Sequence, residues 1–452
     1  MRTFAVRLGL PALLFGLIAV PSLSGQGLFT DARRVGMGGV SLSIDGTLTR
    51  YNPAYRSVPP RTVQGGGGPK FSIPLPLGLI QFFHDHPNIS KDPLFHPDSA
   101  SFNPVELLDL VLTPPLYLEV KQVPTPTNDV AFGIGKDSLQ VLLGAAQSLV
   151  PADAFGIRGE SRPIDIEPSI KGFRFGVMVW LHDDVELQLG DSLLAFLKDG
   201  HPAAHNTLYN VVASATVEGG FAPSIGYSGK VYGDSSRSIY VGVAGHYYFG
   251  AAYGSSSGTA GFTTGDTIFA GPNIVTPKLT AQNAYSKWGN TMGHGVGADV
   301  GIAWVSGPIV FGVGVNDVGA TITWPDTRID YQRYDTTTKT VVTDSSKFHV
   351  ETKTKLPVSY LANVIYSLGG TTVGADVLDN GHATILNIGA EQRFGPFALR
   401  GGISRDQRKL VEFAWGGGVR FGPLGLDVGF WTHSNALSDQ RGITMATSLS
   451  IY

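Results

Sequence analysis

The sequence predicts an all-β protein, a transmembrane antiparallel β-barrel of about 14 strands. Apolar side chains alternate with glycine or charged side chains over runs of about ten residues, as between Val411 and Phe421, and a tilted strand needs about that length to cross a bilayer. Tight glycine-containing turns separate these runs. The composition agrees, because charged residues make up 15% of the chain, against about 25% in soluble proteins.

The first 24 residues have the pattern of a secretory signal peptide. Arg2 and Arg7 precede an apolar run from Leu8 to Val20, and small residues follow at Ser22 and Ser24. The apolar run is shorter than the roughly 20 residues that a membrane-spanning helix needs. We therefore expect export, with cleavage after Ser24.

Charge and cysteine content exclude several protein classes. The net charge is −3 and no basic stripe is visible, so we expect no nucleic-acid partner. The chain contains no cysteine, which excludes a disulfide scaffold and a thiolate metal site.

Four short turns set the expected topology. A glycine at the first central position supplies the positive φ of a type II′ hairpin turn, at Gly307-Pro308, Gly369-Gly370, Gly395-Pro396 and Gly422-Pro423. The connections between Phe249 and Met292 and between Asp317 and Leu356 are long and polar. In outer-membrane barrels the short turns are periplasmic and the long loops extracellular. The last strand should then end at Tyr452, on the short-turn side.

The strand count follows from the same pattern. Twelve runs begin near residues 172, 211, 237, 294, 309, 357, 371, 384, 397, 410, 424 and 443. Phe71 to Phe83 and a segment within 128–163 would supply two more, giving the even number that closure favours. An additional β-segment within Thr321 to Val350 belongs either to an extracellular loop or to a further hairpin.

Three segments are predicted to be helical. One follows the capping residue Asn103, one covers Leu139 to Val150, and a short one covers 192–198 with Asp191 as its cap. We place the first two in a loop insertion at about 84–160.

The two faces of the strands should have different surroundings. We expect lipid to contact one face, at Val411, Phe413, Val419, Leu426 and Val428. The other face carries glycines and isolated charges, a composition that suits a wet lumen. These lumen-facing charges either line a solute path or form mixed-sign pairs that tie strands together: Asp299, Asp376, Glu391, Arg393, Arg400, Glu412, Arg420 and Asp427.

Two further expectations concern the turn at Gly395-Pro396. If Phe394 pairs with Phe397, then Glu391 faces Arg400, and an ion pair in an exposed lumen would contribute only about 0–1 kcal/mol. The aromatic residues beside the turns, Phe394, Phe397 and Phe421, should form an interfacial girdle.

The most specific motif lies just after the leader. Residues 34–41 read Arg-Val-Gly-Met-Gly-Gly-Val-Ser, Asp45-Gly46 follows, and residues 51–54 read Tyr-Asn-Pro-Ala. Over about residues 31–54 this resembles the N-terminal segment of the long-chain fatty acid transporter (FadL) superfamily, whose relatives include type 9 secretion-associated and TraF-like proteins. Tyr55 departs from the family, which often has glycine there, and the 84–160 insertion has no match.

The resemblance implies a domain division and a function. It implies a 14-stranded barrel over 61–452 with an N-terminal luminal plug or hatch over 25–60. The plug residues would be Gly36, Gly38, Gly39, Asp45, Asn52 and Pro53.

Candidate catalytic and metal motifs are weak. His84-Asp85-His86 with His96 is more typical of a polar loop than of a metal site. Gly254 to Gly258 matches the nucleophile-elbow pattern, which requires a strand-to-helix turn, whereas this segment has the composition of a Ser/Gly loop. His246 lacks the spacing of a catalytic triad. We therefore expect no catalytic residue, no metal and no cofactor.

The sequence leaves three functions open for a protein of the cell outer membrane. The first, which the resemblance implies, is uptake of hydrophobic small molecules such as fatty acids. The second is a docking or secretion-associated barrel without transport activity. A general porin is the third, and it would need a single-sign constriction and no plug. The expected partners are outer-membrane lipid, a hydrophobic ligand, and secreted or surface proteins.

Overall fold

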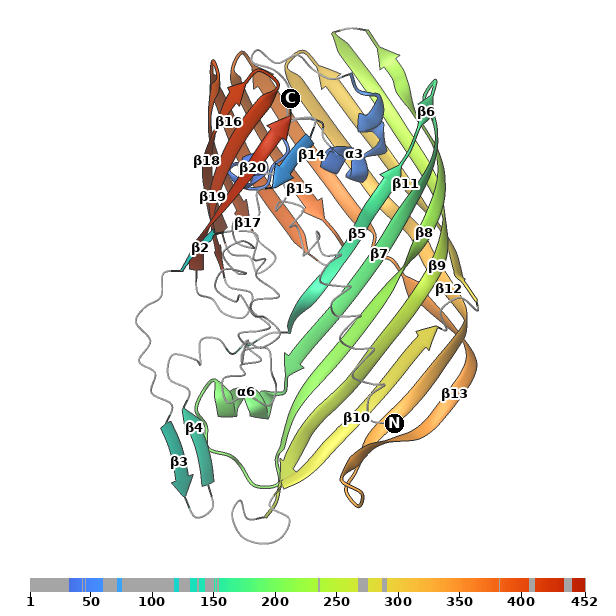
Figure 1. Cartoon of the computed structure of the whole chain (residues 1–452), viewed down its shortest axis with the longest axis vertical. Coiled ribbons are helices and arrows are strands. Elements are labelled where there is room, and N and C mark those ends of the chain that lie inside the picture. The colour runs from blue at the N-terminus through green and yellow to red at the C-terminus, as the bar shows by residue number, and fades with distance from the viewer. Residues whose placement is uncertain are drawn as a thin grey trace.

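The computed structural model is a cylinder of antiparallel strands with short helices inside it (Figure 1). It describes residues 32–59, 71–74, 118–121, 131–135, 138–142, 150–266, 275–286, 291–405, 411–434 and 441–451, apart from single positions 43, 45, 151, 153, 235 and 382. The predicted signal peptide, the predicted helix after Asn103 and the histidines at 84, 86 and 96 lie outside the described residues.

The wall is built from neighbours along the chain. Thirteen strands follow one another around it: β5 (Phe155–Ile166), β7 (Phe173–Leu189), β8 (Leu208–Gly233), β9 (Arg237–Thr264), β11 (Gly293–Ser306), β12 (Ile309–Asp335), β14 (Ser359–Leu368), β15 (Thr371–Asp379), β16 (Thr384–Phe394), β17 (Phe397–Arg405), β18 (Val411–Phe421), β19 (Leu424–Ser434) and β20 (Arg441–Ile451). The two-residue strand β6 (Ser169–Ile170) pairs with the start of β7.

The fourteenth position is shared. Both β1 (Phe71–Pro74) and β2 (Leu118–Lys121) pair with the free edge of β20, at successive heights. Among the described residues the wall therefore has the predicted 14 positions, and each of the twelve strands expected from residue 172 onward begins within three residues of its predicted start.

The four short turns are confirmed. Each leaves two residues between paired strands, as where Phe394 pairs with Phe397. The first central glycine has a positive φ in all four, +49° at Gly307, +58° at Gly369, +60° at Gly395 and +61° at Gly422.

The described parts of the long polar connections are mostly strands, which corrects the prediction that they are loops. Strand β9 runs on to Thr264 and pairs with β10 (Val275–Ser286), and β12 runs on to Asp335 and pairs with β13 (Thr340–Lys355). The segment Thr321 to Val350 is thus a hairpin. We call this part, built from the far halves of β8, β9 and β12 with β10 and β13, the raised sheet. It extends the cylinder on one side, away from the short turns (Figure 1). Its Thr- and Val-containing segments favour strands even where lipid imposes no alternation.

Two helix predictions have different outcomes. The segment predicted as a helix from Leu139 is a strand over β4 (Ser138–Leu142), which pairs with β3 (Ala131–Gly135); hairpin pairing with a neighbouring segment overrides the local apolar pattern. The short helix is present as α6 (Asp191–Leu197), although Gly190 is its N-cap and Asp191 lies in its first turn. None of the described helices is long and apolar enough to cross a membrane.

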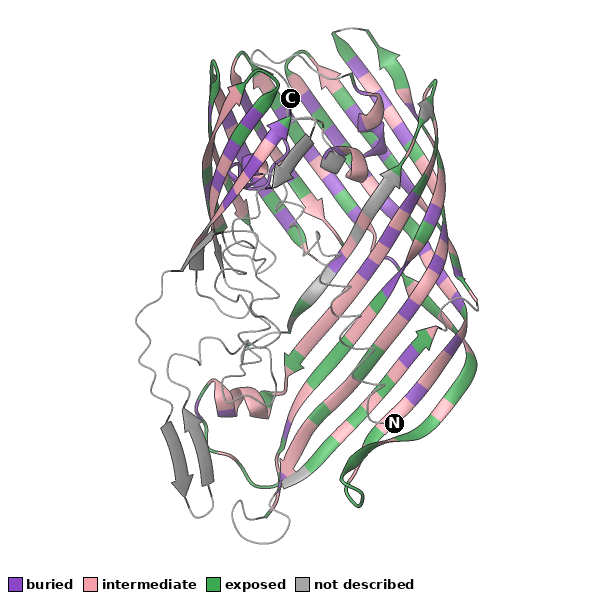
Figure 2. Cartoon of the chain, viewed as in Figure 1, coloured by how far each residue is buried: buried purple, intermediate pink, exposed green. Residues whose placement is uncertain are grey.

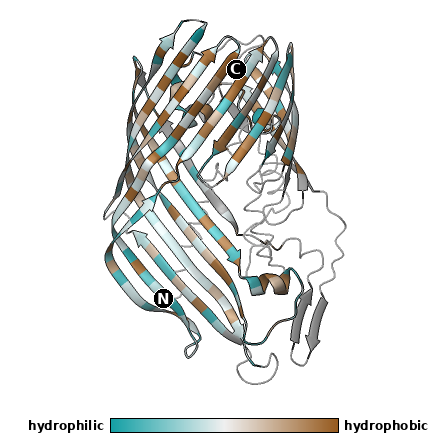
Figure 3. Cartoon of the chain, turned by 180° about the vertical axis from the view of Figure 1, so that it is seen from behind, coloured by the Kyte–Doolittle hydropathy of each residue, from teal (hydrophilic) through white to brown (hydrophobic). Residues whose placement is uncertain are grey.

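Burial alternates along the wall as a lipid-facing barrel requires (Figure 2). Val411 and Phe413 are 41% and 52% exposed, whereas Ala414 is buried. Phe394, Phe397 and Phe421 are 56–72% exposed beside the short turns. Apolar residues are frequent on the wall strands near the short turns, and the raised sheet is more hydrophilic (Figure 3). The chain is therefore a transmembrane barrel with an apolar belt at its short-turn end.

The belt predicts a depth-dependent cost of charge. Val428→Arg, in mid-strand on β19, should reduce the free energy of unfolding by about 2–4 kcal/mol, and Leu424→Arg, directly after a short turn, by about 0–1 kcal/mol. A urea titration of refolding into vesicles measures both. Equal costs at the two positions would contradict a lipid-facing belt.

Candidate functional site: the lumen and the N-terminal segment

The N-terminal segment, residues 32–58, lies inside the cylinder near the short-turn end (Figure 1). It contains α2 (Ala32–Val35), α3 (Gly46–Tyr51) and the 3₁₀ helix η1 (Pro53–Ser57). Apart from positions 43 and 45–47, all of its residues have described burial, and these are buried or half-buried. The segment precedes β1, the first described wall strand, in the chain.

Glycines of the wall make room for this segment. A Cβ atom at Gly402 would overlap the carbonyl of Met37, and one at Gly314 would overlap the carbonyl of Tyr51. A strand glycine often marks such a close backbone approach. The wall glycines that face the segment are Gly242, Gly301, Gly312, Gly314, Gly374, Gly389, Gly402, Gly416 and Gly429. The expectation that the inward glycines face a wet lumen is therefore wrong for these nine.

The glycines of the segment itself end its first helix. Gly38 and Gly39 have φ values of +68° and +89°, and the Gly39 amide donates to the carbonyl of Arg34 at 2.9 Å. This is the left-handed termination that glycine favours. Gly36 lies against the backbone of Gly416, because a Cβ atom added at Gly36 would be only 3.1 Å from the Cα atom of Gly416.

Asn52 fixes the second half of the segment. Its side chain is fully buried, accepts a hydrogen bond from the Ala54 amide at 3.0 Å and donates one to the carbonyl of Ile302 at 2.9 Å. It thus caps η1 and attaches η1 to the wall at once, while Pro53 takes the first position, where a missing amide costs nothing. Asp45 lies outside the described residues.

Tyr55, the departure from the resembled motif, adds a further attachment. Its hydroxyl donates to Asn363 Oδ1 at 2.7 Å. Burial raises the pKa of Tyr55 well above its usual value. The hydroxyl therefore stays protonated and remains a donor.

A buried ion cluster joins the segment to β16, β17 and β19. Glu391 accepts hydrogen bonds from the Nε atoms of Arg33 at 2.8 Å, Arg400 at 2.7 Å and Arg393 at 2.7 Å. Arg400 also contacts Asp427 at 2.7 Å. The predicted pairing of Glu391 with Arg400 is confirmed. The expected exposure is wrong, because the two residues are only 2% and 7% exposed.

Three other sequence-predicted charges make hydrogen bonds with neutral groups. Asp376 accepts from Asn387 at 2.6 Å and from the backbone amide of Ser41 at 3.3 Å. On the neighbouring strands, Glu412 accepts from Ser404 at 3.3 Å and Arg420 donates to the carbonyl of Gly422 at 3.0 Å. Glu391 and Asp376 thus also bind the N-terminal segment.

Asp299 belongs to a second buried network, which sequence reasoning missed. His246 Nε2 lies 2.8 Å from Asp299, and the backbone amide of Asp317 donates to the same carboxylate at 2.9 Å. Arg162 contacts Asp317 at 2.8 Å, Asp299 at 3.5 Å and Glu160 at 3.1 Å. No local signal marked Arg162, because β5 was assigned only to a broad interval and Asp317 to a loop.

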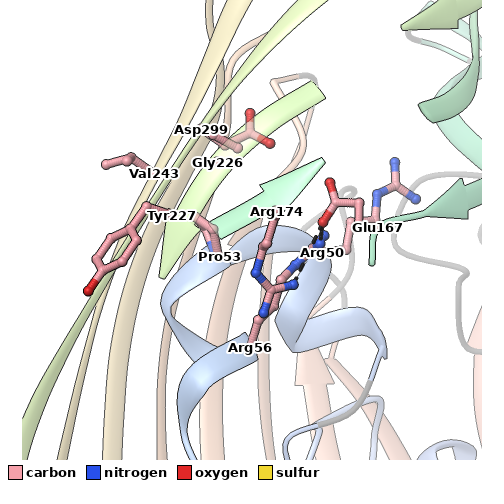
Figure 4. Close-up of a pocket in the computed structure, with 10 residues that line it drawn as sticks. Arg50, Pro53, Arg56, Glu167, Arg174, Gly226, Tyr227, Val243 and Asp299 are labelled. Carbon is pink, nitrogen blue, oxygen red and sulfur yellow. Dashed lines mark ion pairs between the residues drawn. The ribbon is translucent and has the colours of Figure 1, made fainter. Parts of the chain in front are cut away.

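Arginines connect this network to the segment. Arg50 lies 3.6 Å from Glu160, and Arg56 pairs with Glu167, which Arg174 approaches to 3.8 Å. Figure 4 shows these three arginines around Glu167 in a pocket between the segment and the wall. Each arginine faces a carboxylate, so the pocket attaches the segment to the β5 side of the barrel.

An apolar group occupies the lumen face of β7, β9 and β12. We call Trp180, Tyr248, Tyr253 and Trp324 the luminal aromatic cluster; all are at most 7% exposed and pack with Met178, Ile322 and Leu356. The rings of Tyr253 and Trp324 stack with centroids 5.3 Å apart, and those of Trp180 and Tyr248 meet edge to face at 5.6 Å.

Glycine again permits this packing. The Trp324 ring covers the paired glycines Gly250 and Gly293, and a Cβ on Gly293 would lie 2.7 Å from it. The indole Nε1 of Trp324 donates to Glu218 at 3.2 Å. This cluster could not be predicted from the sequence, because Tyr253 and Trp324 fall in segments expected to be loops.

Gly254 to Gly258, the segment with the nucleophile-elbow pattern, lies within β9 and pairs with β8 and β10. It is neither the strand-to-helix turn that the motif needs nor the loop that we expected. His246, the other residue considered for catalysis, is buried and lies beside Asp299 on the neighbouring strand β11.

Comparison with known proteins yields low similarity only. Neither the protein-family models nor the curated protein sequences produce a match. Among solved structures the chain is similar to the toluene transporter TodX of P. putida (10% identity, TM-score 0.33, 74% of this chain and 87% of that one). It is also similar to the toluene transporter TbuX of Ralstonia pickettii (11%, TM-score 0.29, 63% and 79%) and to a mutant Rh. blastica porin (10%, TM-score 0.20, 54% and 92%). Any function must therefore be argued from the geometry of this chain.

Proposed function

We propose that the protein is an outer-membrane channel for hydrophobic small molecules, closed at its short-turn end by the N-terminal segment acting as a plug. One observation carries the proposal: the lumen of a lipid-facing barrel contains a buried aromatic cluster above a segment that fits the wall. A porin for polar solutes would be expected to line its path with charge and water. Here the inward charges are engaged in ion pairs or hydrogen bonds, and the largest buried rings face inward.

The proposal keeps the domain division that the sequence predicts. Residues 1–24 direct export, 25–60 form the plug and 61–452 form the barrel. Within the plug, Gly38 and Gly39 allow the left-handed turn, and Asn52 and Pro53 anchor η1. Fatty acids and small aromatic compounds both belong to the class of solutes that such a lumen would admit.

Adjacent wall glycines provide a matched test of the plug. Gly402→Ala places a methyl group against the carbonyl of Met37, whereas the Cβ of Gly401→Ala has its nearest neighbour, the carbonyl of Ala414, at 4.0 Å. We expect Gly402→Ala to loosen residues 32–42, so that trypsin cleaves after Arg33 or Arg34 several times faster than in the parent protein. Gly401→Ala should leave the cleavage rate unchanged. The same rate in both variants would argue against a close fit of segment and wall.

A docking role is the second candidate, and the raised sheet favours it. Strand β13 pairs only with β12 among the described residues, and its side chains are mostly exposed. A barrel without transport activity, such as the secretion-associated relatives of the resembled family imply, could present this sheet to a secreted or surface protein. Cells that lack the protein discriminate the two roles: loss of hydrophobic-solute uptake supports the channel, and loss of a surface protein with normal uptake supports docking.

A further inference from the structure

Two ring nitrogens beside Tyr248 are buried without a hydrogen-bond partner. Trp180 is 0% exposed and its Nε1 has no partner in the described part of the chain; the same holds for Nδ1 of His246, which is 4% exposed. The ring centroids of Trp180 and His246 lie 5.6 Å and 6.1 Å from that of Tyr248. A buried polar group without a partner costs about 1–3 kcal/mol, and such exceptions in native proteins call for an explanation.

The chemistry of the two nitrogens differs. An indole N–H can only donate. His246 Nε2 lies 2.8 Å from the Asp299 carboxylate, which can only accept when ionised. In the neutral tautomer that donates to this carboxylate, the proton sits on Nε2 and Nδ1 is an acceptor. One free donor and one free acceptor thus flank the aromatic ring of Tyr248, whose own hydroxyl donates to Asp317.

The charges nearby oppose an anionic solute. Three carboxylates, those of Glu160, Asp299 and Asp317, share the guanidinium of Arg162. Glu218, a fourth carboxylate, lies within the aromatic cluster and is 1% exposed. Two further basic side chains lie nearby, Arg50 at 3.6 Å from Glu160 and His182 at 3.0 Å from Glu218. Because each of these basic groups already faces at least one carboxylate, a further negative charge would be repelled in a medium of low dielectric constant.

We propose that the solute of this channel is a neutral aromatic molecule that carries a hydroxyl group. The inference rests on the proposed function and narrows it. The ring would enter between Trp180 and Tyr248, replacing an edge-to-face contact by two aromatic contacts. Its hydroxyl would accept from Trp180 Nε1 and donate toward His246 Nδ1, which a hydrocarbon cannot do. The proposal disfavours fatty acid anions, which the sequence analysis named as an example of the solute.

Three probes with the same ring test the proposal: toluene, phenol and benzoate. Their binding to the detergent-solubilised full chain is measured by isothermal titration calorimetry, with protein-free micelles as the blank. We expect phenol to bind about tenfold more tightly than toluene, the effect of one hydrogen bond of ordinary net strength, and benzoate to bind no better than toluene. Trp180→Phe keeps a ring but removes the N–H, and should bring phenol to the level of toluene. Trp304→Phe, on the lipid-facing side of β11 where Trp304 is 39% exposed, is the matched control and should change neither.

The outcomes distinguish a failure of this inference from a failure of the proposed channel function. Equal affinities for phenol and toluene in the parent protein, or tightest binding of benzoate, would overturn the inference and leave a channel for hydrophobic molecules. An equal loss of toluene and phenol in Trp180→Phe would show that the N–H is not the recognition group. Binding of none of the three would count against the channel itself.

Discussion

Deletion of residues 28–58, with the signal peptide retained, is expected to convert a closed barrel into an open one. No ladder pair among the described strands involves the deleted segment, so the wall should still assemble. The nine wall glycines that now contact the segment would then face water. In a planar bilayer the deletion variant should show discrete conductance steps, and the intact chain measured in parallel should show almost none.

The deletion result is interpretable only for a folded barrel. Heat-modifiable mobility on a gel and a β-rich circular dichroism spectrum establish folding before conductance is measured. Near-zero conductance in a correctly folded deletion variant would show that the segment is not the barrier. That outcome would remove the plug and most of the support for transport.

The wall was predictable because two local constraints act on every residue of it. Lipid requires an apolar side chain at every second position, so that Val411, Phe413 and Trp415 are all exposed in phase. A two-residue hairpin requires a positive φ, which glycine supplies at Gly395 and Gly422. Together they fix register, and from register alone the Glu391–Arg400 contact could be predicted.

The raised sheet was not predictable in the same way. Beyond the membrane both faces of a strand meet water or other protein, so alternation is lost and a Thr- and Ser-rich strand has the composition of a loop. What makes β10 a strand is its pairing with β9 and β12, for example Val275 with Thr264 and Thr280 with Arg333. These are contacts with other strands, which a local window does not contain.

The candidate site could be predicted only in part, for a related reason. An inward glycine looks the same in a sequence whether it faces water or the backbone of another segment, as Gly402 faces Met37. The resemblance covers about residues 31–54, but its motif begins at Arg34 and did not single out Arg33, which binds Glu391 across 358 positions of sequence. Trp180 and Trp324 likewise form one cluster only in the folded barrel, where β7 and β12 face the same lumen.

Glu391→Ala should be among the most destabilising single substitutions in the barrel. The side chains of Arg33, Arg393 and Arg400 converge on this carboxylate at 2.7–2.8 Å. Removal of the carboxylate would leave three guanidinium groups close together, and the Arg33 and Arg400 side chains are 5% and 1% exposed. Breaking a buried ion pair by deleting one partner costs about 3–5 kcal/mol, and we expect a loss of unfolding free energy in that range.

Glu412→Ala is the matched control, because Glu412 is a half-buried carboxylate on the nearby strand β18 that accepts from Ser404. Its loss should cost about 0–1 kcal/mol, as for other partly solvated charges. Urea titrations in vesicles measure both variants. The double variant Arg33→Met with Glu391→Gln removes one cation together with the anion, and should recover part of the loss if uncompensated charge is its cause. Equal costs for Glu391→Ala and Glu412→Ala, or no recovery in the double variant, would mean that the cluster does not hold the segment by charge. Attachment of the segment would then rest on the glycine contacts and on Asn52.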